Sequence, residues 1–428
     1  MKLYNLKKTK EIVNFSKAVK LGLGSNQGLF FPNTIPKISK KKLKKLLKMN
    51  FIDRSYKILS MFIKSEISKK NLKKIVSTSF SFTKPKLKNI VKKISCLELF
   101  HGPTLAFKDF GARFMAQTLF YLNKKNHPIT ILTATSGDTG AAVAHAFYKM
   151  KNIKVVILYP KGKISKLQEQ LFCTLGENIQ TISVNGTFDE CQNLVKKSFQ
   201  NSEIKKKTHL NSANSINISR LMAQICYYFE AFSLVPKKYR KKIIISVPCG
   251  NFGNLTAGLL SKSMGLPIKK FVLSTNSNNT VPRFLQTGYW NPHKTISTIS
   301  NAMDISEPNN WIRVKEIFLK NNWNIKSLGY GSVSEKNTKK NLLELFKLNY
   351  ISEPHAATAY KVLKKYKKKE FFGIFLGTAH CSKFQKTVEK VLNISIKLPK
   401  RLSKYSKKKI ISKNIDPDFN ELKKILLI

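Results

Sequence analysis

The feature that most constrains the fold is a regular alternation of short β-branched runs with amphipathic stretches between residues 129 and 199. The predicted elements are strands at Ile129–Thr133, Ile153–Tyr159 and Ile179–Val184, and helices at 140–150, 165–175 and 188–199. A strand, helix, strand order needs crossover connections, which are right-handed and join parallel strands. The sequence therefore predicts an α/β protein built on a parallel sheet.

The alternation resumes after a long helix predicted over 218–232, which indicates a second sheet. The further predicted strands lie at 243–247, 271–275 and 371–376, and the strand at 371–376 is the last one in the chain. A helix is predicted at 255–264, and a helical stretch over roughly 313–367. Two sheet-containing halves with a cleft between them follow from this order.

The first 95 residues carry helical patterns at 41–47 and 56–63 but show no chemical motif, so we interpret them as a structural or subunit-contact region. A chain of 428 residues is long enough for two or three domains. We predict an N-terminal segment over 1–95, a smaller α/β domain over 96–210 and a larger α/β domain over 211–428.

The basic residues could by themselves suggest a nucleic-acid-binding protein. The chain has 78 Lys and Arg residues against 23 Asp and Glu, a net charge of +55. Only seven of them are arginines, which stand at positions 54, 113, 220, 240, 283, 313 and 401. Nucleic-acid readers favour arginine for its planar fork, whereas these lysines are spread over the whole chain. We expect no specific nucleic-acid partner, and a lysine-rich nucleic-acid-binding protein stays the alternative of a different class.

The six cysteines are scattered, with no C-x-x-C pair and no Cys/His spacing of the kind that a zinc site needs. They are Cys96, Cys173, Cys191, Cys226, Cys249 and Cys381. The opening residues contain no apolar run like that of a signal peptide, and no uninterrupted stretch of about 18 apolar residues occurs. We therefore expect a cytoplasmic protein with no metal site and no membrane partner, either a monomer or a homodimer.

Three glycine-containing turns fall at the carboxyl ends of predicted strands, where open α/β sheets bind ligands. They are Thr135-Ser136-Gly137-Asp138-Thr139-Gly140, Pro248-Cys249-Gly250-Asn251-Phe252-Gly253-Asn254 and Leu376-Gly377-Thr378-Ala379-His380. The first two precede helices, whose free backbone N–H groups favour an anion. An N-cap turn or a strand-end turn without ligand is the alternative for each. Together the turns predict an anion-binding cleft.

Lys108 differs from most lysines of the chain because apolar residues surround it in Leu105-Ala106-Phe107-Lys108-Asp109-Phe110. Burial disfavours the charged ammonium, and a neutral amine is what forms a Schiff base. A surface lysine with a buried stem, or an ion pair with Asp109, is the alternative.

These motifs resemble the threonine synthase family, whose members use pyridoxal phosphate to make threonine from O-phospho-L-homoserine. The resemblance is carried by the opening residues 1–5 and by 101–111, 133–142, 211–220, 250–254, 301–304, 352–355 and 376–380. It extends in order over nearly the whole chain. It implies a fold-type II enzyme (tryptophan synthase β-like), with two parallel-sheet domains that carry helices on both faces, plus an N-terminal segment.

The resemblance also implies roles for individual residues. Lys108 matches the catalytic lysine that forms a Schiff base with pyridoxal 5'-phosphate. The cofactor phosphate would be held by Gly250, Asn251, Phe252, Gly253 and Asn254, and the pyridine nitrogen would face Thr378. The turn formed by Thr135, Ser136, Gly137, Asp138 and Thr139 would hold the substrate carboxylate, with Asp138 beside the 3-oxygen of the cofactor. The reaction would be γ-elimination of phosphate followed by addition of water at the β-carbon.

For the phosphate of the substrate we name Arg220 and Arg113, because a guanidinium binds phosphate bidentately, although either can instead pair with a carboxylate.

Two positions depart from the family pattern, Cys249 in place of serine and Cys381 in place of proline. A nucleophile pair formed by His380 and Cys381 is one alternative reading of the last turn. For the function of the whole chain, the alternative within the same fold is another fold-type II enzyme, such as a threonine dehydratase or a cysteine synthase.

Overall fold

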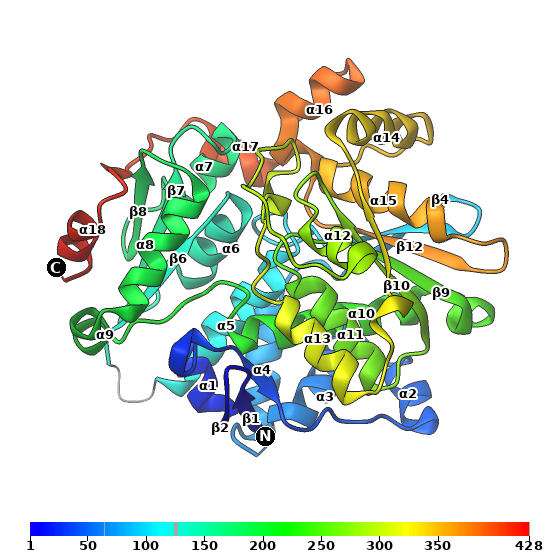
Figure 1. The fold of residues 1–428 in the computed structure, drawn as a ribbon, viewed down its shortest axis with the longest axis horizontal. Helices are drawn as coiled ribbons and strands as arrows, with labels where there is room; N and C mark the ends of the chain where they lie inside the picture. Colours follow the sequence, from blue (N-terminus) through cyan, green and yellow to red (C-terminus); the bar gives the residue numbers. More distant parts are fainter. Residues whose placement is uncertain (64, 124–126, 428) are drawn as a thin grey trace.

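The computed structural model describes residues 1–63, 65–123 and 127–427, which form three sheets with helices packed around them (Figure 1). The smaller of the two parallel sheets has the strand order β13-β8-β7-β6. Its strands are β6 (Ile129–Ala134), β7 (Ile153–Pro160), β8 (Ile179–Val184) and β13 (Lys413–Ile415). The helices around it are α5 (Lys108–Leu122), α6 (Asp138–Phe147), α7 (Lys166–Phe172), α8 (Phe188–Gln200), α9 (Ser202–Thr208), α17 (Lys400–Ser406) and α18 (Phe419–Leu427).

Both faces of this four-stranded sheet are covered at its central strand β7, which explains the nearly continuous apolar sequence of that strand. Val155 and Ile157 of β7 pack in the cluster that contains residues of α5, α6 and α7. Val156 and Leu158, which alternate with them, pack in a second cluster with residues of α8 and α18. The strand sequence therefore alternates between two apolar layers.

The six-stranded sheet has the order β11-β10-β9-β12-β5-β4, and all its neighbouring strands are parallel except the β4-β5 hairpin. Its strands are β4 (Lys86–Val91), β5 (Ile94–Glu98), β9 (Ile243–Pro248), β10 (Ile268–Thr275), β11 (Gly329–Ser332) and β12 (Phe372–Gly377). Its helices are α10 (Ile218–Leu234), α11 (Gly253–Met264), α12 (Thr280–Thr287), α13 (Trp311–Lys320), α14 (Glu335–Lys347), α15 (Pro354–Tyr366) and α16 (Gln385–Leu392). Ile243 and Ile245 face the α10 and α11 side, and Ile244 faces α15.

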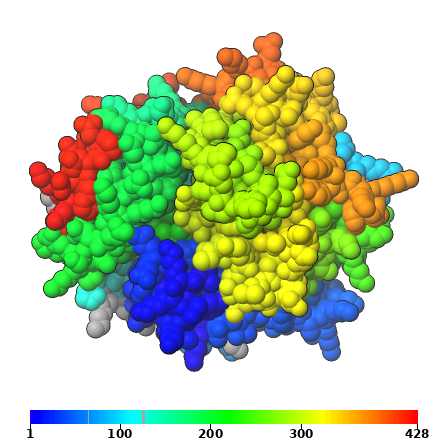
Figure 2. Space-filling view, in the orientation of Figure 1, coloured from blue at the N-terminus to red at the C-terminus, as the bar shows by residue number. Residues whose placement is uncertain are grey.

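The N-terminal residues form a small antiparallel sheet and four helices that lie along the lower edge of the molecule in Figures 1 and 2. The strands are β1 (Lys2–Asn5), β2 (Lys8–Asn14) and β3 (Phe30–Pro32), and the helices are α1 (Phe15–Leu21), α2 (Lys40–Leu46), α3 (Phe51–Ile63) and α4 (Lys69–Ser79). Helices α3 and α4 pack against α10 and α5, and a buried ion pair joins Arg54 of α3 to Glu230 of α10. This region thus supports the two helices whose first turns carry the predicted site residues Lys108 and Arg220.

Two expectations about the strands are wrong. The predicted helical stretch over 313–367 is interrupted by β11, and β12 is followed by another strand, β13, which pairs with β8 in the four-stranded sheet. The C-terminal end of the chain therefore returns to the smaller sheet, where α18 contacts α8 and α9 (Figures 1 and 2). Residues 96–98 likewise belong to β5 of the six-stranded sheet. The proposed division at residues 95 and 210 stays a prediction. Strand β5, which begins the proposed smaller domain, pairs with β12 of the larger one, and β13 of the larger domain pairs with β8 of the smaller one.

No helix within the described ranges is long and apolar enough to cross a membrane. The six cysteines are free, five of them buried and Cys381 partly exposed.

Candidate active site

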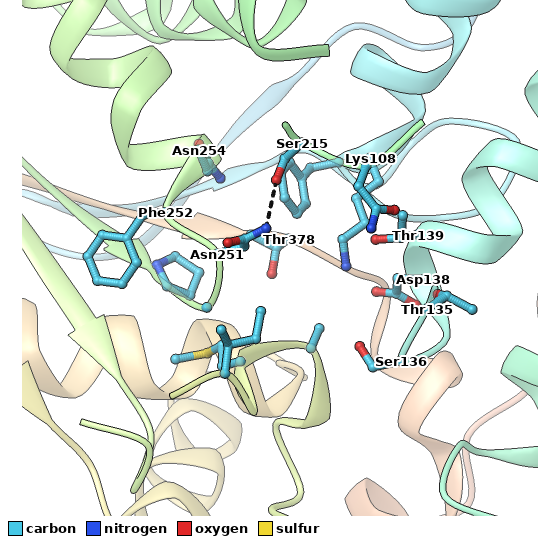
Figure 3. Close-up of a pocket in the computed structure, with 18 of the residues that line it drawn as sticks. Lys108, Thr135, Ser136, Asp138, Thr139, Ser215, Asn251, Phe252, Asn254 and Thr378 are labelled. Atoms are coloured by element: carbon cyan, nitrogen blue, oxygen red, sulfur yellow. Dashed lines mark hydrogen bonds between the residues drawn. The ribbon is translucent and has the colours of Figure 1, made fainter. Parts of the chain in front are cut away.

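The three turns predicted to bind ligands come together around one pocket (Figure 3). They follow β6, β9 and β12, and because parallel strands present their carboxyl ends at the same edge, each turn opens towards the space between the two sheets. The pocket is lined by Lys108, by Thr135, Ser136, Asp138 and Thr139 of the first turn, by Gly250 to Asn254 of the second and by Thr378 of the third, together with Ser215, Arg220, Met303 and His355 among others.

Lys108 is the first residue of α5 and extends into this pocket. Burial lowers the pKa of its amine from 10.5 to about 8, and the positive charges of Lys383 and Arg220 act in the same direction. The carboxylates of Asp138 and Glu353 oppose the shift. With a pKa of about 8, a minor fraction of the amine is neutral at physiological pH, far more than in a lysine with an ordinary pKa. The surface-lysine alternative does not describe this residue.

Asp109 is not the partner of Lys108. Its carboxylate accepts hydrogen bonds from the backbone N–H of Thr104 at 2.9 Å and from the Thr104 hydroxyl at 2.7 Å. These bonds hold the segment that precedes α5 against the first turn of the helix. The neighbour of Lys108 thus has a structural role in positioning the helix start.

The turn after β6 is stabilised by Thr135, whose hydroxyl oxygen accepts the backbone N–H groups of Gly137 at 3.0 Å and Gly140 at 2.7 Å. Gly137 has φ of +123°, and a Cβ there would lie 2.7 Å from the side chain of Gln168. Gly137 is therefore needed for the turn and is not among the described residues that line the pocket. Ser136 and Thr139 are lining residues (Figure 3).

Asp138 begins α6 and is buried beneath this turn. Its carboxylate pairs with the ammonium of Lys383 at 2.6 Å and accepts a hydrogen bond from Nε2 of Gln168 at 3.0 Å. Although burial opposes ionisation, the charges of Lys383 and Lys108 and these hydrogen bonds hold the pKa of Asp138 well below its usual range. Sequence reasoning missed Lys383, because nothing in its local sequence marks it as buried.

The loop between β9 and α11, residues 249–252, leaves no room for a side chain at Gly250, and we call this loop with Gly253 the glycine cradle. A Cβ on Gly250 would lie 2.6 Å from the carbonyl oxygen of Ala302, and Phe252 adopts a left-handed conformation with φ of +59°. The amide of Asn251 is occupied by Ser215 and Asn309, each at 3.1 Å. These contacts fix the loop at the N-terminus of α11, where helix N–H groups point into the pocket.

Asn254 presents a donor to the same space. Its side-chain oxygen accepts the hydroxyls of Tyr227 and Tyr228, both at 2.7 Å. Its Nδ2 is buried and has no hydrogen-bond partner among the described residues. Because burial raises the pKa values of both tyrosines, their hydroxyls stay protonated and keep the amide in this orientation. The unpaired Nδ2 is therefore a donor available to a bound anion.

The third turn brings Thr378 against Glu353, a residue for which we predicted no role. The Thr378 hydroxyl donates to Oε1 of Glu353 at 3.1 Å, and Glu353 also caps the start of α15 by accepting the backbone N–H of Ala356 at 2.9 Å. Nδ1 of His355 donates to the other oxygen of Glu353 at 2.5 Å, and Nε2 accepts the backbone N–H of Ala302 at 3.2 Å. A carboxylate N-cap followed by proline was the available local signal.

The two predicted arginines have different positions. Arg220 is 3% exposed and lines the pocket; burial lowers its pKa to about 10, and its Nε has no partner among the described residues. Its Nη1 donates to the carbonyl of Ala213. Arg113 is not among the lining residues within the described ranges. Its guanidinium donates to the carbonyls of Thr78 and Ser79 at 2.8 and 2.7 Å, so its fork is used to hold the end of α4.

The cysteine alternative is not supported by the geometry. Sγ of Cys381 lies 3.8 Å from Nδ1 of His380, but this nitrogen accepts the backbone N–H of Ser382 at 3.2 Å. Burial raises the pKa of Cys381 to about 11 and lowers that of His380, so neither group is activated. Cys249 is buried beside the loop, where its thiol donates to the carbonyl of Val247 at 3.2 Å. Within the described ranges no group of His, Cys, Asp and Glu residues is arranged to hold a metal ion.

The residues present fit pyridoxal phosphate. The unpaired Nδ2 of Asn254 and the glycine cradle suit a phosphate at the start of α11, and the amine of Lys108 faces the same pocket from α5. Thr378 lines the wall formed by β12. These groups come from both parallel sheets, so a ligand that contacts all of them spans the space between the two.

Comparisons with known proteins agree with this arrangement. The family described as pyridoxal-phosphate dependent enzyme matches residues 85–373, and those described as threonine synthase N terminus and threonine synthase, C-terminal match 4–80 and 356–426. The chain is 66% identical to a threonine synthase of Buchnera aphidicola subsp. Baizongia pistaciae, with 100% of both chains covered. It is 55% identical to that of Escherichia coli strain K12, with 100% of this chain and 99% of the relative covered.

Solved structures give the same result. The crystal structure of threonine synthase from Escherichia coli matches with a TM-score of 0.97 and 54% identity, covering 100% of this chain and 99% of the other. A structure of threonine synthase from Brucella melitensis with bound pyridoxal phosphate matches with a TM-score of 0.91 and 28% identity, at the same coverage.

Proposed function

The chain belongs to the threonine synthase family of pyridoxal-phosphate-dependent enzymes, and from that premise we propose that its pocket converts O-phospho-L-homoserine and water into L-threonine and phosphate. Its architecture is that of the fold-type II enzymes. The observation that carries the proposal is the lowered pKa of Lys108 in a pocket that also contains a free amide donor on a glycine cradle.

When bound, pyridoxal phosphate supplies an electron sink that makes protons on the neighbouring carbons of an amino acid removable. Lys108 is the residue that we assign to cofactor attachment and, once released, to proton transfer at the α- and β-carbons of the substrate. An amine with a pKa near 8 can both accept and return a proton at physiological pH. Phosphate leaves from the γ-carbon, which takes up a proton and becomes the methyl group of threonine. Water adds its hydroxyl at the β-carbon, the α-carbon is protonated again, and the remaining proton leaves with the phosphate.

The remaining lining residues divide between the cofactor and the substrate. We assign the cofactor phosphate to the loop Gly250 to Asn254, because its glycines and free amide suit an anion. The substrate carboxylate belongs to Ser136 and Thr139 in the turn at the start of α6, supported by the helix N-terminus there. Arg220 is the cation that we assign to the substrate phosphate, because its buried guanidinium has an unpaired Nε at the pocket.

The proposal is tested by incubating the purified chain with added pyridoxal phosphate and O-phospho-L-homoserine and measuring phosphate release and threonine formation together. Lys108→Ala is the test variant, and Lys44→Ala, on the exposed surface of α2, is the matched control. We expect equal amounts of phosphate and threonine from the parent and from the control, and none from Lys108→Ala.

Folded protein that binds the cofactor but forms no threonine would overturn the proposal. Release of a 2-oxo acid from L-threonine or L-serine would then indicate a dehydratase of the same fold.

We also propose a cytoplasmic location, which is supported by six cysteines that are all free.

A further inference from the structure

Lys383 is a buried lysine for which the proposed reaction has no use. Its side chain is 0% exposed, in a chain whose lysines are mostly at the surface. It lies in the short 3₁₀ helix Cys381–Phe384, directly after the turn that carries Thr378. Its ammonium donates to Oδ1 of Asp138 at 2.6 Å and to the carbonyl oxygen of Thr104 at 2.9 Å. A buried ammonium is costly unless it is paired in this way, so the residue needs a reason for being there.

The ion pair connects the two parallel sheets behind the wall of the pocket. Asp138 begins α6, which follows β6 of the four-stranded sheet, whereas Lys383 follows β12 of the six-stranded sheet. A second bond joins Lys383 to the four-stranded sheet, because the hydroxyl of Ser165, the N-cap of α7, donates to the carbonyl of Lys383 at 3.1 Å. Asp138 lines the pocket with Lys108, and Lys383 is not among its described lining residues (Figure 3). Lys383 therefore acts on the pocket only through its partner.

Asp138 is the charged group with the largest effect on the pKa of Lys108, and it favours the protonated amine. Lys383 is the charge that opposes it most strongly, followed by Arg220, while Glu353 adds to the effect of Asp138. An unpaired carboxylate at position 138 would favour the protonated amine of Lys108 more strongly, and a protonated amine cannot attack a carbonyl carbon. Burial is the largest cause of the lowered pKa of Lys108, and a partner that cancels the charge of Asp138 allows burial to lower this pKa further.

We propose that Lys383 is a positioning residue that holds Asp138 in a neutral ion pair across the junction of the two sheets, so that the amine of Lys108 faces no net negative charge from the first turn. This inference rests on the proposed function for the role of Lys108. The ion pair itself does not depend on that function.

The other charged groups near Lys383 do not remove its effect on the pocket. Asp109 is close enough for Lys383 to favour its ionised form, but its carboxylate is bonded to Thr104. His145 and His380 have pKa values below the ordinary range, so they are neutral at physiological pH and add no charge to the pair. Asp138 remains the carboxylate to which Lys383 is bonded.

The test measures the protonation of Lys108 in the cofactor-free protein. Trace acetic anhydride labels only neutral amines, and the degree of labelling of the Lys108 peptide, measured by mass spectrometry from pH 6 to 10, gives a midpoint for this residue. The exposed Lys44 is an internal reference in every sample. The variants are Lys383→Met, Asp138→Asn and the double variant, with Lys383→Arg as the conservative replacement.

We expect Lys383→Met to raise the midpoint of Lys108 by about one pH unit, which means about tenfold less neutral amine at a given pH below it. Asp138→Asn should lower the midpoint, because Lys383 is then an unpaired positive charge near Lys108. The double variant should return close to the parent value, and Lys383→Arg should stay close to it. The midpoint of Lys44 should not move in any of them.

An unchanged midpoint in Lys383→Met, or a double variant that matches Lys383→Met, would show that Lys383 only stabilises the fold. If Lys383→Met does not fold, the comparison of Asp138→Asn with the double variant decides the question, because these two differ only at residue 383. The double variant must then have the higher midpoint by about one unit. Since the measurement uses neither substrate nor cofactor, its failure is distinct from a failure of the proposed function.

Discussion

The hydroxyl of Thr378 donates its proton to Oε1 of Glu353 at 3.1 Å, at the end of β12. Glu353 is 2% exposed and also accepts three N–H groups from the start of α15 and from the His355 ring. The oxygen of Thr378 is thus held by a buried carboxylate, and what it offers the pocket is a pair of acceptor sites. The residue that fixes Thr378 lies in a different segment of the chain.

Thr378→Asp should reduce both stability and turnover, because it places a second carboxyl beside Glu353. Two buried carboxylates in contact cannot both be ionised without a large cost, so one must retain a proton and its pKa must rise. A carboxyl with a raised folded-state pKa stabilises the protein at low pH and loses this contribution as pH increases. Urea unfolding should therefore show a loss of about 2 kcal/mol at pH 7 and a smaller one at pH 5.

Thr378→Val is the control for this prediction, since it removes the hydroxyl without adding a charge. Its loss of stability should be about 1 kcal/mol and the same at both pH values. An equal loss at pH 5 and pH 7 for Thr378→Asp would contradict the contact with Glu353.

Replacing Tyr227 and Tyr228 by phenylalanine should weaken the binding of pyridoxal phosphate without removing any lining side chain. Each hydroxyl donates to the side-chain oxygen of Asn254, and either one alone can still orient the amide. We expect each single variant to raise the Kd for the cofactor a few-fold and the double variant to raise it about tenfold or more. Equilibrium dialysis of the cofactor-free protein measures this directly.

Tyr360→Phe provides the matched control, because the hydroxyl of Tyr360 donates to Glu344 on α14 and is not part of the pocket. Its Kd should equal that of the parent. A double Tyr227/Tyr228 variant with parental affinity would mean that other contacts orient Asn254.

Lys108→Met should stabilise the cofactor-free protein at pH 7. The pKa of Lys108 falls from 10.5 to about 8 on folding, so below pH 8 the folded state holds a protonated amine in an unfavourable environment. Between about pH 8 and 10.5 the unfolded chain binds more protons, and the stability of the parent rises with pH. The advantage of the variant should therefore be about 1–3 kcal/mol at pH 7 and should disappear as pH approaches 10.5.

The control for this prediction is Lys44→Met, because Lys44 is exposed in the folded protein and its surroundings change little on folding. Its unfolding free energy should lie within about 0.5 kcal/mol of the parent across the same pH range. A Lys108→Met variant that is less stable than the parent at pH 7 would show that the amine contributes favourable contacts in the folded state.

Arg220→Lys and Arg113→Lys should have different effects, although both residues were candidates for the substrate phosphate. A lysine at 220 cannot bind phosphate bidentately, so we expect the KM for O-phospho-L-homoserine and the inhibition constant for phosphate to rise about tenfold. Arg113→Lys should leave both constants unchanged and lower Tm, because it loses carbonyl contacts at the end of α4. A larger kinetic effect at 113 than at 220 would reverse this assignment.

Much of the fold was predictable because its information is local. Strand β8 has the predicted bounds, Ile179–Val184, because four of its six residues are β-branched and therefore favour a strand. Strands β11 and β13 have no such pattern. The first, Gly329–Ser332, contains two glycines, and the second has three residues, so each is a strand only because β10 or β8 lies beside it.

The sequence by itself determined the α/β class, the three turns at strand ends and the exceptional position of Lys108, because parallel strands bring distant turns to one edge without further information. Only the tertiary structure decided which charges are buried together. Each of the seven arginines donates to at least one backbone carbonyl, yet only Arg220 of the seven is among the described lining residues. Lys383 has an equally undistinguished local sequence. Burial and pairing depend on side chains from distant segments, and the charge state of the pocket is set by those contacts.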